Sequence, residues 1–102
     1  MIPLIERHRE DITSLCQRYH VALLEVFGSA ADETFDPSRS DLDFLVDFHT
    51  VPHISAADQY FGLWEDLKTL FCREVDLVCV GALKNRCFIE EVNRSRKPLY
   101  AA

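Results

Sequence analysis

The segment "FGSAADETFDPSRSDLDFLV", residues 27 to 46, decides the fold. An apolar run ends in Gly28 and Ser29, a polar loop follows, and a second apolar run begins with Asp41 and Asp43. Side chains of a strand alternate between its two faces, so these two aspartates project from the same face, with Cα atoms roughly 6 to 7 Å apart. The spacing therefore allows both carboxylates to contact one cation.

The sequence around this segment predicts alternating helices and strands. Ser55 and Asp58 have the spacing of a capping box, which marks the start of a helix. An alternating order predicts an α/β fold in which helices pack on a sheet. The expected elements are a helix over about 3–19, strands over 21–27 and 41–48, a core helix over 55–72, a strand over 74–80, a helix over about 82–93 and a short edge strand over 97–100.

Length and composition limit the protein's class. The chain has 102 residues, of which 48% are apolar, and this predicts one domain spanning residues 1–102. No apolar run approaches the ~18 residues that span a bilayer, and the N-terminal residues are charged, so we expect a cytoplasmic protein with no membrane partner. The net charge of -6 argues against direct nucleic-acid binding and suits cations or a basic protein partner.

Four cysteines lie inside apolar segments and lack the paired C-x2-C spacing of zinc sites. We therefore expect buried free thiols at Cys16, Cys72, Cys79 and Cys87.

Asp76 adds a third carboxylate. It interrupts the apolar run "EVDLVCV", and if this strand neighbours the one carrying Asp41 and Asp43, three acids gather on one face. Two unit charges ~4 Å apart repel by about 4 kcal/mol at an effective dielectric of 20. Oxygen ligands favour hard cations, so the cluster predicts a site for Mg²⁺ or Mn²⁺ rather than a stabilising feature. The alternative to a cation site is that Asp41 and Asp43 bind nothing and lie in solvent at the end of a strand.

Gly28 and Ser29 follow a strand directly, where backbone N–H groups and a hydroxyl can approach phosphate oxygens, especially if a short helix begins at "SAAD". The sequence contains neither G-x4-G-K-[ST] nor G-x-G-x-x-G. A phosphate site here is therefore of another kind than a P-loop or a dinucleotide fingerprint.

The ordered set of Gly28-Ser29, then Asp41 and Asp43 in "SDLDFLV", then Asp76 in "VDLV", resembles the DNA polymerase β-like nucleotidyltransferase superfamily. The length and the order of elements resemble its minimal (MNT) branch over nearly the whole chain. The resemblance implies a polymerase β-like palm, a small mixed sheet packed with helices.

The resemblance also implies roles for these residues. Asp41, Asp43 and Asp76 would be catalytic and would bind Mg²⁺, with Asp76 helping to activate the attacking hydroxyl. Gly28 and Ser29 would bind the β- and γ-phosphates of ATP, the AMP donor. Stand-alone domains of this kind are often antitoxins that adenylylate a tyrosine of a HEPN-domain toxin. That toxin is then the expected partner, and homo- and hetero-oligomers both stay open.

One departure from the family pattern leaves an alternative open. Relatives often carry an arginine shortly after the Gly-Ser pair, whereas Ala30, Ala31 and Asp32 follow here; Arg39 is a candidate substitute. The rival hypothesis is a catalytically feeble module that neutralises the toxin by binding it. A third, modification of a small molecule such as an aminoglycoside, would need a further substrate-binding domain. The basic residues Arg94, Arg96 and Lys97 are expected to complement a helix C-terminus or contact a partner.

Overall fold

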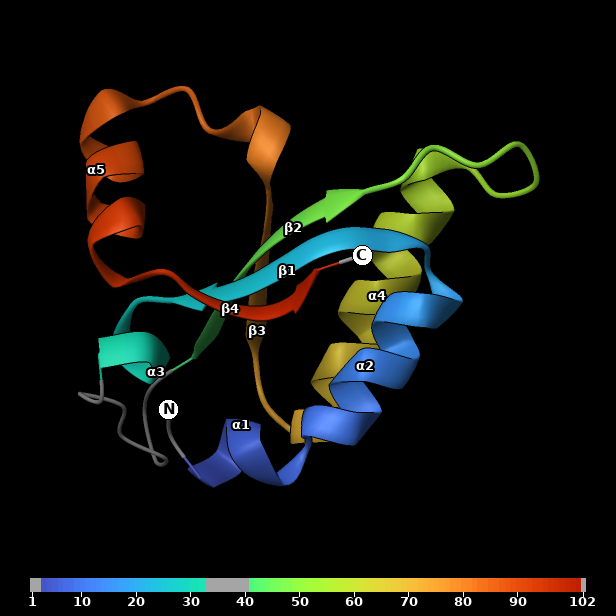
Figure 1. The fold of residues 1–102 in the computed structure, drawn as a ribbon, viewed down its shortest axis with the longest axis horizontal. Helices are drawn as coiled ribbons and strands as arrows, with labels where there is room; N and C mark the ends of the chain where they lie inside the picture. Colours follow the sequence, from blue (N-terminus) through green and yellow to red (C-terminus); the bar gives the residue numbers. More distant parts are fainter. Residues whose placement is uncertain (1–2, 33–40, 102) are drawn as a thin grey trace.

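A four-stranded mixed sheet forms the centre of the protein, in a computed structural model that describes residues 3–32 and 41–101 (Figure 1). Its spatial order is β3-β2-β1-β4. The central strand β1 is antiparallel to both of its neighbours, and β2 and β3 are parallel to each other. The strands are β1 (Val21–Phe27), β2 (Leu42–Phe48), β3 (Val75–Cys79) and β4 (Lys97–Ala101). The expected α/β fold with a small mixed sheet is confirmed.

Two parallel neighbours need a long crossover connection, because the chain must return to the starting end of the sheet. Here α4 (Ala56–Phe71) makes that return between β2 and β3. The hydroxyl of Ser55 accepts a hydrogen bond from the Asp58 N–H at 3.1 Å, so the predicted cap is present. The crossover thus brings two strands together that are separated by a whole helix in the sequence.

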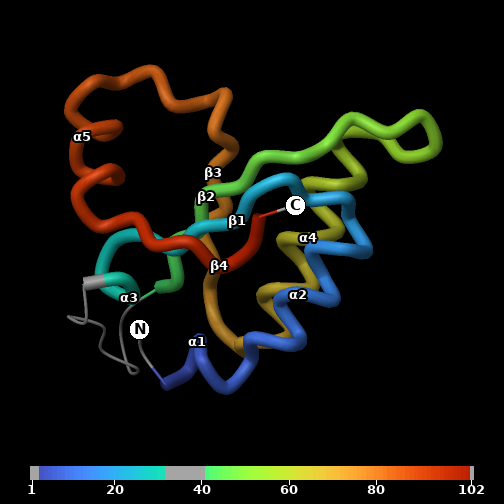
Figure 2. Tube along the Cα trace, viewed as in Figure 1, coloured from blue at the N-terminus to red at the C-terminus, as the bar shows by residue number. Residues whose placement is uncertain are grey.

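Helices cover the sheet unequally. The second helix, α2 (Arg9–Arg18), and α4 lie side by side, and α5 (Arg86–Ser95) lies apart from them (Figures 1 and 2). Alternation along β2 divides its apolar side chains as predicted: Phe44 belongs to the large core cluster, and Leu45 belongs to a smaller cluster with Phe27 and Val92. The remaining short elements are α1 (Pro3–Arg7), α3 (Ser29–Asp32) and the 3₁₀ turn η1 (Val80–Ala82).

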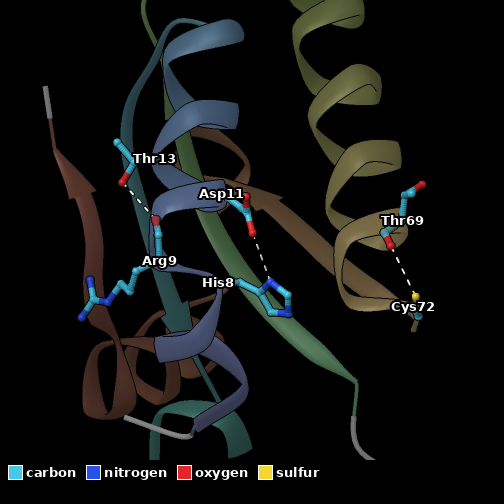
Figure 3. Close-up of polar contacts among 6 residues, drawn as sticks. All are labelled: His8, Arg9, Asp11, Thr13, Thr69 and Cys72. Carbon is cyan, nitrogen blue, oxygen red and sulfur yellow. Dashed lines mark hydrogen bonds and ion pairs between the residues drawn. The ribbon is translucent and has the colours of Figure 1, made fainter.

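The prediction of one helix over 3–19 is wrong, because the helix is interrupted at His8, between α1 and α2. His8 has φ -109° and ψ 17°, outside the helical range. Its Nδ1 lies 3.3 Å from Asp11 Oδ2, as Figure 3 shows, and its ring meets Phe71 edge-on at 5.3 Å between centroids. These tertiary contacts hold the turn in place, and helical periodicity alone does not reveal them.

Three further expectations are corrected. The last helix starts at Arg86 rather than Ala82, because residues 80–82 form a 3₁₀ turn and the Asn85 side chain caps α5 by accepting from the Phe88 N–H at 3.1 Å. Phe61 lies in the predicted core helix over 55–72 but is 57% exposed. All four thiols are free, but Cys72 and Cys87 are exposed.

The exposed Cys72 thiol lies at the end of α4 and donates to the Thr69 carbonyl at 3.5 Å (Figure 3). Cys16 is buried as expected, and its burial raises the pKa of the thiol to about 12. Within residues 3–32 and 41–101, no helix combines the length and the apolar character needed to cross a membrane.

Candidate functional site

The parallel pairing of β2 with β3 places two of the predicted acids side by side. Asp43 and Asp76 are register partners on the two strands. Asp43 is half-buried and Asp76 is exposed. Asp41 immediately precedes β2 and is also exposed. The strands therefore bring Asp43 and Asp76 into a pair, with Asp41 one alternation earlier on the same face.

Gly28 lies directly against this pair. Its neighbour Phe27 is the register partner of Asp43 on β1, so the chain turns away from the sheet beside the Asp43 carboxylate. Gly28 has φ +72°, and a Cβ atom added to it would lie 2.7 Å from Asp43 Oδ2. Both the positive φ and the closeness of the Asp43 carboxylate disfavour a side chain at this position.

The turn at Gly28 leads into α3, whose first residue is Ser29, as the sequence suggested for "SAAD". The Ala31 N–H donates to the Gly28 carbonyl at 3.0 Å, and the Gly28 N–H donates to the Ser95 hydroxyl of α5 at 2.9 Å. Ser29 is half-buried. A link between α5 and this turn was not expected from the sequence.

The surroundings of Asp43 raise its pKa from 3.8 to about 6. Burial is the largest cause, followed by the charge of Asp76, a hydrogen bond with Asp76 and the charge of Asp41. Like charges and partial burial both disfavour the ionised form. A bound cation would reverse both effects, since it would supply the missing counter-charge.

The donor set fits a hard divalent cation, because it consists of carboxylate oxygens alone. Asp43 and Asp76 would hold such an ion, and Asp41 is close enough for its charge to act on Asp43. As the side chains stand in the described ranges, no group of three His, Cys, Asp or Glu residues converges into a complete ligand set. Such an ion would therefore draw the rest of its ligands from water and substrate phosphates, as Mg²⁺ commonly does.

A cleft of about 240 Å³ opens over the acid pair, with α5 as its far wall. Phe88 of α5 is 37% exposed and meets Phe27 edge-on at 6.0 Å between ring centroids. The cleft thus combines acids at one end with apolar and aromatic surface at the other, which is the character of a small-molecule site. Its lining consists of Phe27, Gly28, Asp43, Asp76, Val78, Phe88, Glu91, Val92 and Ser95.

A neighbouring cavity of about 280 Å³ also opens beside the Gly28 turn, and its lining consists of Gly28, Glu91, Arg94 and Ser95. Among the cavities of the described residues that this turn lines, it is the one with a basic residue, Arg94. Arg39, the candidate substitute for the missing arginine, lies outside the described residues. Arg96 has a different role, since its guanidinium donates from Nε to the Glu25 carboxylate of β1 at 2.7 Å.

The sequence missed three residues of this site: Phe88, Arg94 and Ser95. All three lie on α5, more than 40 residues from the Asp-x-Asp strand. A short amphipathic helix in the sequence shows which face is apolar, but not which sheet edge it covers. Only the packing of α5 reveals their place in the site.

Comparisons with known proteins agree with this geometry. The profile of the family described as "Polymerase beta, Nucleotidyltransferase" matches residues 10–102. A protein of Methanocaldococcus jannaschii that bears the name of a protein adenylyltransferase is 33% identical over 82 residues, which cover 80% of this chain and 76% of that protein.

Solved structures share the fold. One described as a minimal nucleotidyltransferase is 31% identical, with a TM-score of 0.73 over 92% of this chain and 91% of that one. Another is a complex of a tri-AMPylated Shewanella oneidensis HEPN toxin with an MNT antitoxin. It matches at 20% identity, with a TM-score of 0.63 over 95% of this chain and 72% of that one. At this identity the second structure supports the fold alone.

Proposed function

Since the chain belongs to the polymerase β nucleotidyltransferase family, we propose that it transfers AMP from ATP to a hydroxyl group of a partner protein. The observation that carries the proposal is the register pairing of Asp43 with Asp76 beside Gly28, whose positive φ and closeness to the Asp43 carboxylate favour glycine. Phosphoryl transfer asks the protein mainly to position the reactants and to balance charge. The acids, the turn and the cleft can do both.

In the proposed reaction the acceptor oxygen attacks the α-phosphorus of ATP. A new O–P bond forms, the bond between the α-phosphorus and the bridging oxygen breaks, and pyrophosphate leaves with that oxygen. Asp76 is exposed at the mouth of the cleft, so its carboxylate can take the proton that the hydroxyl loses. A Mg²⁺ ion held by Asp43 and Asp76, with Asp41 close enough for its charge to act on Asp43, would neutralise the charge on the phosphates when bound.

The phosphates would lie against Gly28 and Ser29, because that turn adjoins the acids. The charge needed there comes from Arg94 in the proposed site. Arg94 lies in the last turn of α5, where the partial negative charge of the helix dipole alone would disfavour a phosphate. The positive charge of its guanidinium would outweigh that partial negative charge. It thereby compensates for the arginine missing after Ser29.

The proposed acceptor is a tyrosine of a HEPN-domain toxin, which would make this protein the antitoxin of a toxin–antitoxin pair. The choice of acceptor follows the complex of an AMPylated HEPN toxin with an MNT antitoxin, whose fold this chain shares, and transfer to a protein is supported by the relative named as a protein adenylyltransferase. A second candidate is neutralisation by binding, with feeble catalysis. It is favoured by the absence of arginine after Ser29 and by the engagement of the Gly28 N–H with Ser95.

The test is to incubate the protein with Mg²⁺, ATP labelled at the α-phosphate and the HEPN protein encoded beside it. We expect label and the mass of AMP on a HEPN tyrosine, and no label when the γ-phosphate carries the isotope. Asp43→Asn and Asp76→Asn should abolish labelling while the complex still forms. A tight complex that stays unlabelled with the wild type would favour neutralisation by binding instead.

A further inference from the structure

A second hollow lies on the free edge of the sheet, outside the nucleotide cleft. It has a volume of about 270 Å³ and separates α4 from β3. We call it the edge groove. Phe61, which forms part of it, is 57% exposed, although apolar side chains of this size are usually buried. Its lining consists of Tyr60, Phe61, Trp64, Glu74, Val75, Asp76, Leu77 and Val78.

Two aromatic side chains fix the wall of the edge groove. The Tyr60 hydroxyl donates to the Leu77 carbonyl at 2.6 Å, and Trp64 Nε1 donates to the Val75 carbonyl at 2.8 Å. Both carbonyls belong to β3, the edge strand, and would otherwise be available to another strand. Because these carbonyls already accept a hydrogen bond each, they are less available for backbone pairing with a partner, and side chains become the main means of recognition.

Phe61 projects from this fixed wall. Its ring meets Tyr60 edge-on at 5.1 Å and Trp64 edge-on at 6.4 Å between centroids. Three aromatic rings held in one orientation offer rigid contact area at little cost in conformational entropy, which is typical of the centre of a protein interface.

The edge groove is continuous with the nucleotide cleft through Asp76. This residue lines both hollows, as does its neighbour on the same face, Val78. The two sites also interact electrostatically, since burial and the charges of Cys79 and Asp76 raise the pKa of Tyr60. A segment lying in the edge groove would therefore end at the carboxylate that is proposed to take the acceptor's proton.

The charge of the edge groove limits its occupant. Its ionisable lining apart from Tyr60 consists of Glu74 and Asp76, both exposed, and Lys68 Nζ lies 4.0 Å from the centroid of the Trp64 ring. On the β3 side of the edge groove, an acidic side chain would be repelled by Glu74 and Asp76, whereas a basic side chain would find a partner at Glu74. The exposed face of Phe61 calls for an apolar side chain in the same segment.

We propose that the edge groove binds the acceptor protein through a segment that sets an apolar side chain against Phe61 and a basic side chain beside Glu74, and so brings its hydroxyl to Asp76. This inference rests on the proposed function, because Asp76 matters to the acceptor only if a hydroxyl is modified there. It adds the docking surface and the chemistry of the docked segment.

Trp64 allows binding to be measured without catalysis, since it is the single tryptophan of the chain and lies in the edge groove. The probe is a short synthetic tyrosine peptide with flanking leucine and lysine residues, titrated while Trp64 fluorescence is recorded. We expect a saturable change with this peptide and none with a peptide in which glutamate replaces lysine. Equal responses to both peptides, or no saturable change, would overturn the proposal.

Variants locate the binding surface. Phe61→Ala and Glu74→Lys should each weaken the peptide at least about tenfold, as truncation of an interface anchor commonly does. Glu10→Lys is the matched control, because it makes the same charge change on an exposed position of α2 that does not line the edge groove. An equal loss of affinity in Glu10→Lys and Glu74→Lys would show a general charge effect and reject the site.

A labelling assay separates this inference from the proposed function. With the HEPN protein and α-labelled ATP, Phe61→Ala should raise the KM for the protein acceptor and leave the KM for ATP unchanged. If Phe61→Ala labels the HEPN protein as efficiently as the wild type does, the edge groove is not the acceptor site, although the protein is a transferase. If Phe61→Ala loses peptide binding and the wild type transfers no AMP, the edge groove is a docking surface, but the proposed reaction is wrong. A concentration-dependent dimer that Phe61→Ala abolishes would assign the edge groove to a second copy of the chain.

Discussion

At the scale of a single residue, the environment of Asp43 and its proposed role favour opposite protonation states. Its carboxylate lies beside Asp76 and close to Gly28, where burial and the neighbouring charge disfavour ionisation. The proposed reaction nevertheless needs it ionised, to hold a cation. Strain of this electrostatic kind is common at functional sites, where it is offset by the rest of the fold.

The pH dependence of stability should show this conflict. Because the pKa of Asp43 is raised from 3.8 to about 6, the unfolded chain loses this proton between about pH 4 and pH 6 while the folded chain keeps it. The stability of the wild type relative to Asp43→Asn should therefore fall as the pH rises through this window, then level off. We expect a decrease of about 1 to 2 kcal/mol, reduced from the full shift because Asp43 is only half-buried.

Urea unfolding of both proteins at pH 4, 5, 6 and 7 would measure this difference. Mg²⁺ should oppose the decrease above pH 6, since it supplies the counter-charge. A relative stability that rises with pH would contradict the assignment.

Arg94 should matter for the phosphates and little for the fold. Arg94→Gln removes the positive charge beside Gly28, and we expect the KM for ATP to rise about tenfold, the scale of one charged hydrogen bond, with a smaller change in kcat. Arg86→Gln at the other end of α5 is the control. Steady-state kinetics with varied ATP would decide, and equal effects of the two substitutions would remove Arg94 from the site.

At the scale of elements, α5 decides whether the nucleotide cleft exists. Two polar contacts fasten the C-terminal end of α5 to β1 and to the turn that follows it: the Gly28 N–H donates to the Ser95 hydroxyl, and Arg96 pairs with the buried carboxylate of Glu25. Val92 adds an apolar contact in the cluster with Phe27 and Leu45. Phe88, nearer the other end of α5, meets Phe27 edge-on at 6.0 Å between ring centroids. The far wall of the cleft is therefore held by apolar contacts along its length and by polar contacts at its C-terminal end.

Arg96→Ala should detach that end. It leaves Glu25 nearly buried without its partner, and loss of one member of such a pair costs about 3 kcal/mol. Because α5 would also loosen, AMP transfer should fall together with stability. A double variant, Glu25→Leu with Arg96→Leu, should recover stability but not activity. Thermal unfolding and transferase assays on the three proteins would check both expectations, and a stable, fully active Arg96→Ala would refute them.

The elements also show which sequence signals suffice. Period-two alternation predicted β2 and the face of each residue, and turn chemistry predicted the cap at Ser55, because both signals are local. The break at His8 is accompanied by a contact with the distant residue Phe71, which a local pattern does not reveal. The late start of α5 follows a 3₁₀ turn and a cap by Asn85, and the helical periodicity of the sequence did not separate these from the helix. Local patterns therefore predicted the elements well and their ends less well.

At the scale of the whole molecule, the order β3-β2-β1-β4 assembles the site from four separate parts of the chain. The sequence predicted Gly28, Asp43 and Asp76 because each is a chemically unusual residue in an apolar strand or at its end. It could not predict Ser95, Arg94 or the edge groove. Ordinary surface residues acquire a role there only through the packing of α5 and α4 on the sheet.

The place of β4 has a consequence for synthesis on the ribosome. β4 pairs with β1, so one of the first strands to be translated waits for residues 97–101 before its outer edge is covered. Until then Glu25 also lacks Arg96, and the Gly28 turn lacks Ser95. We therefore expect the nascent chain to stay incompletely folded until β4 emerges, so that the proposed nucleotide site forms only when the four described strands have paired.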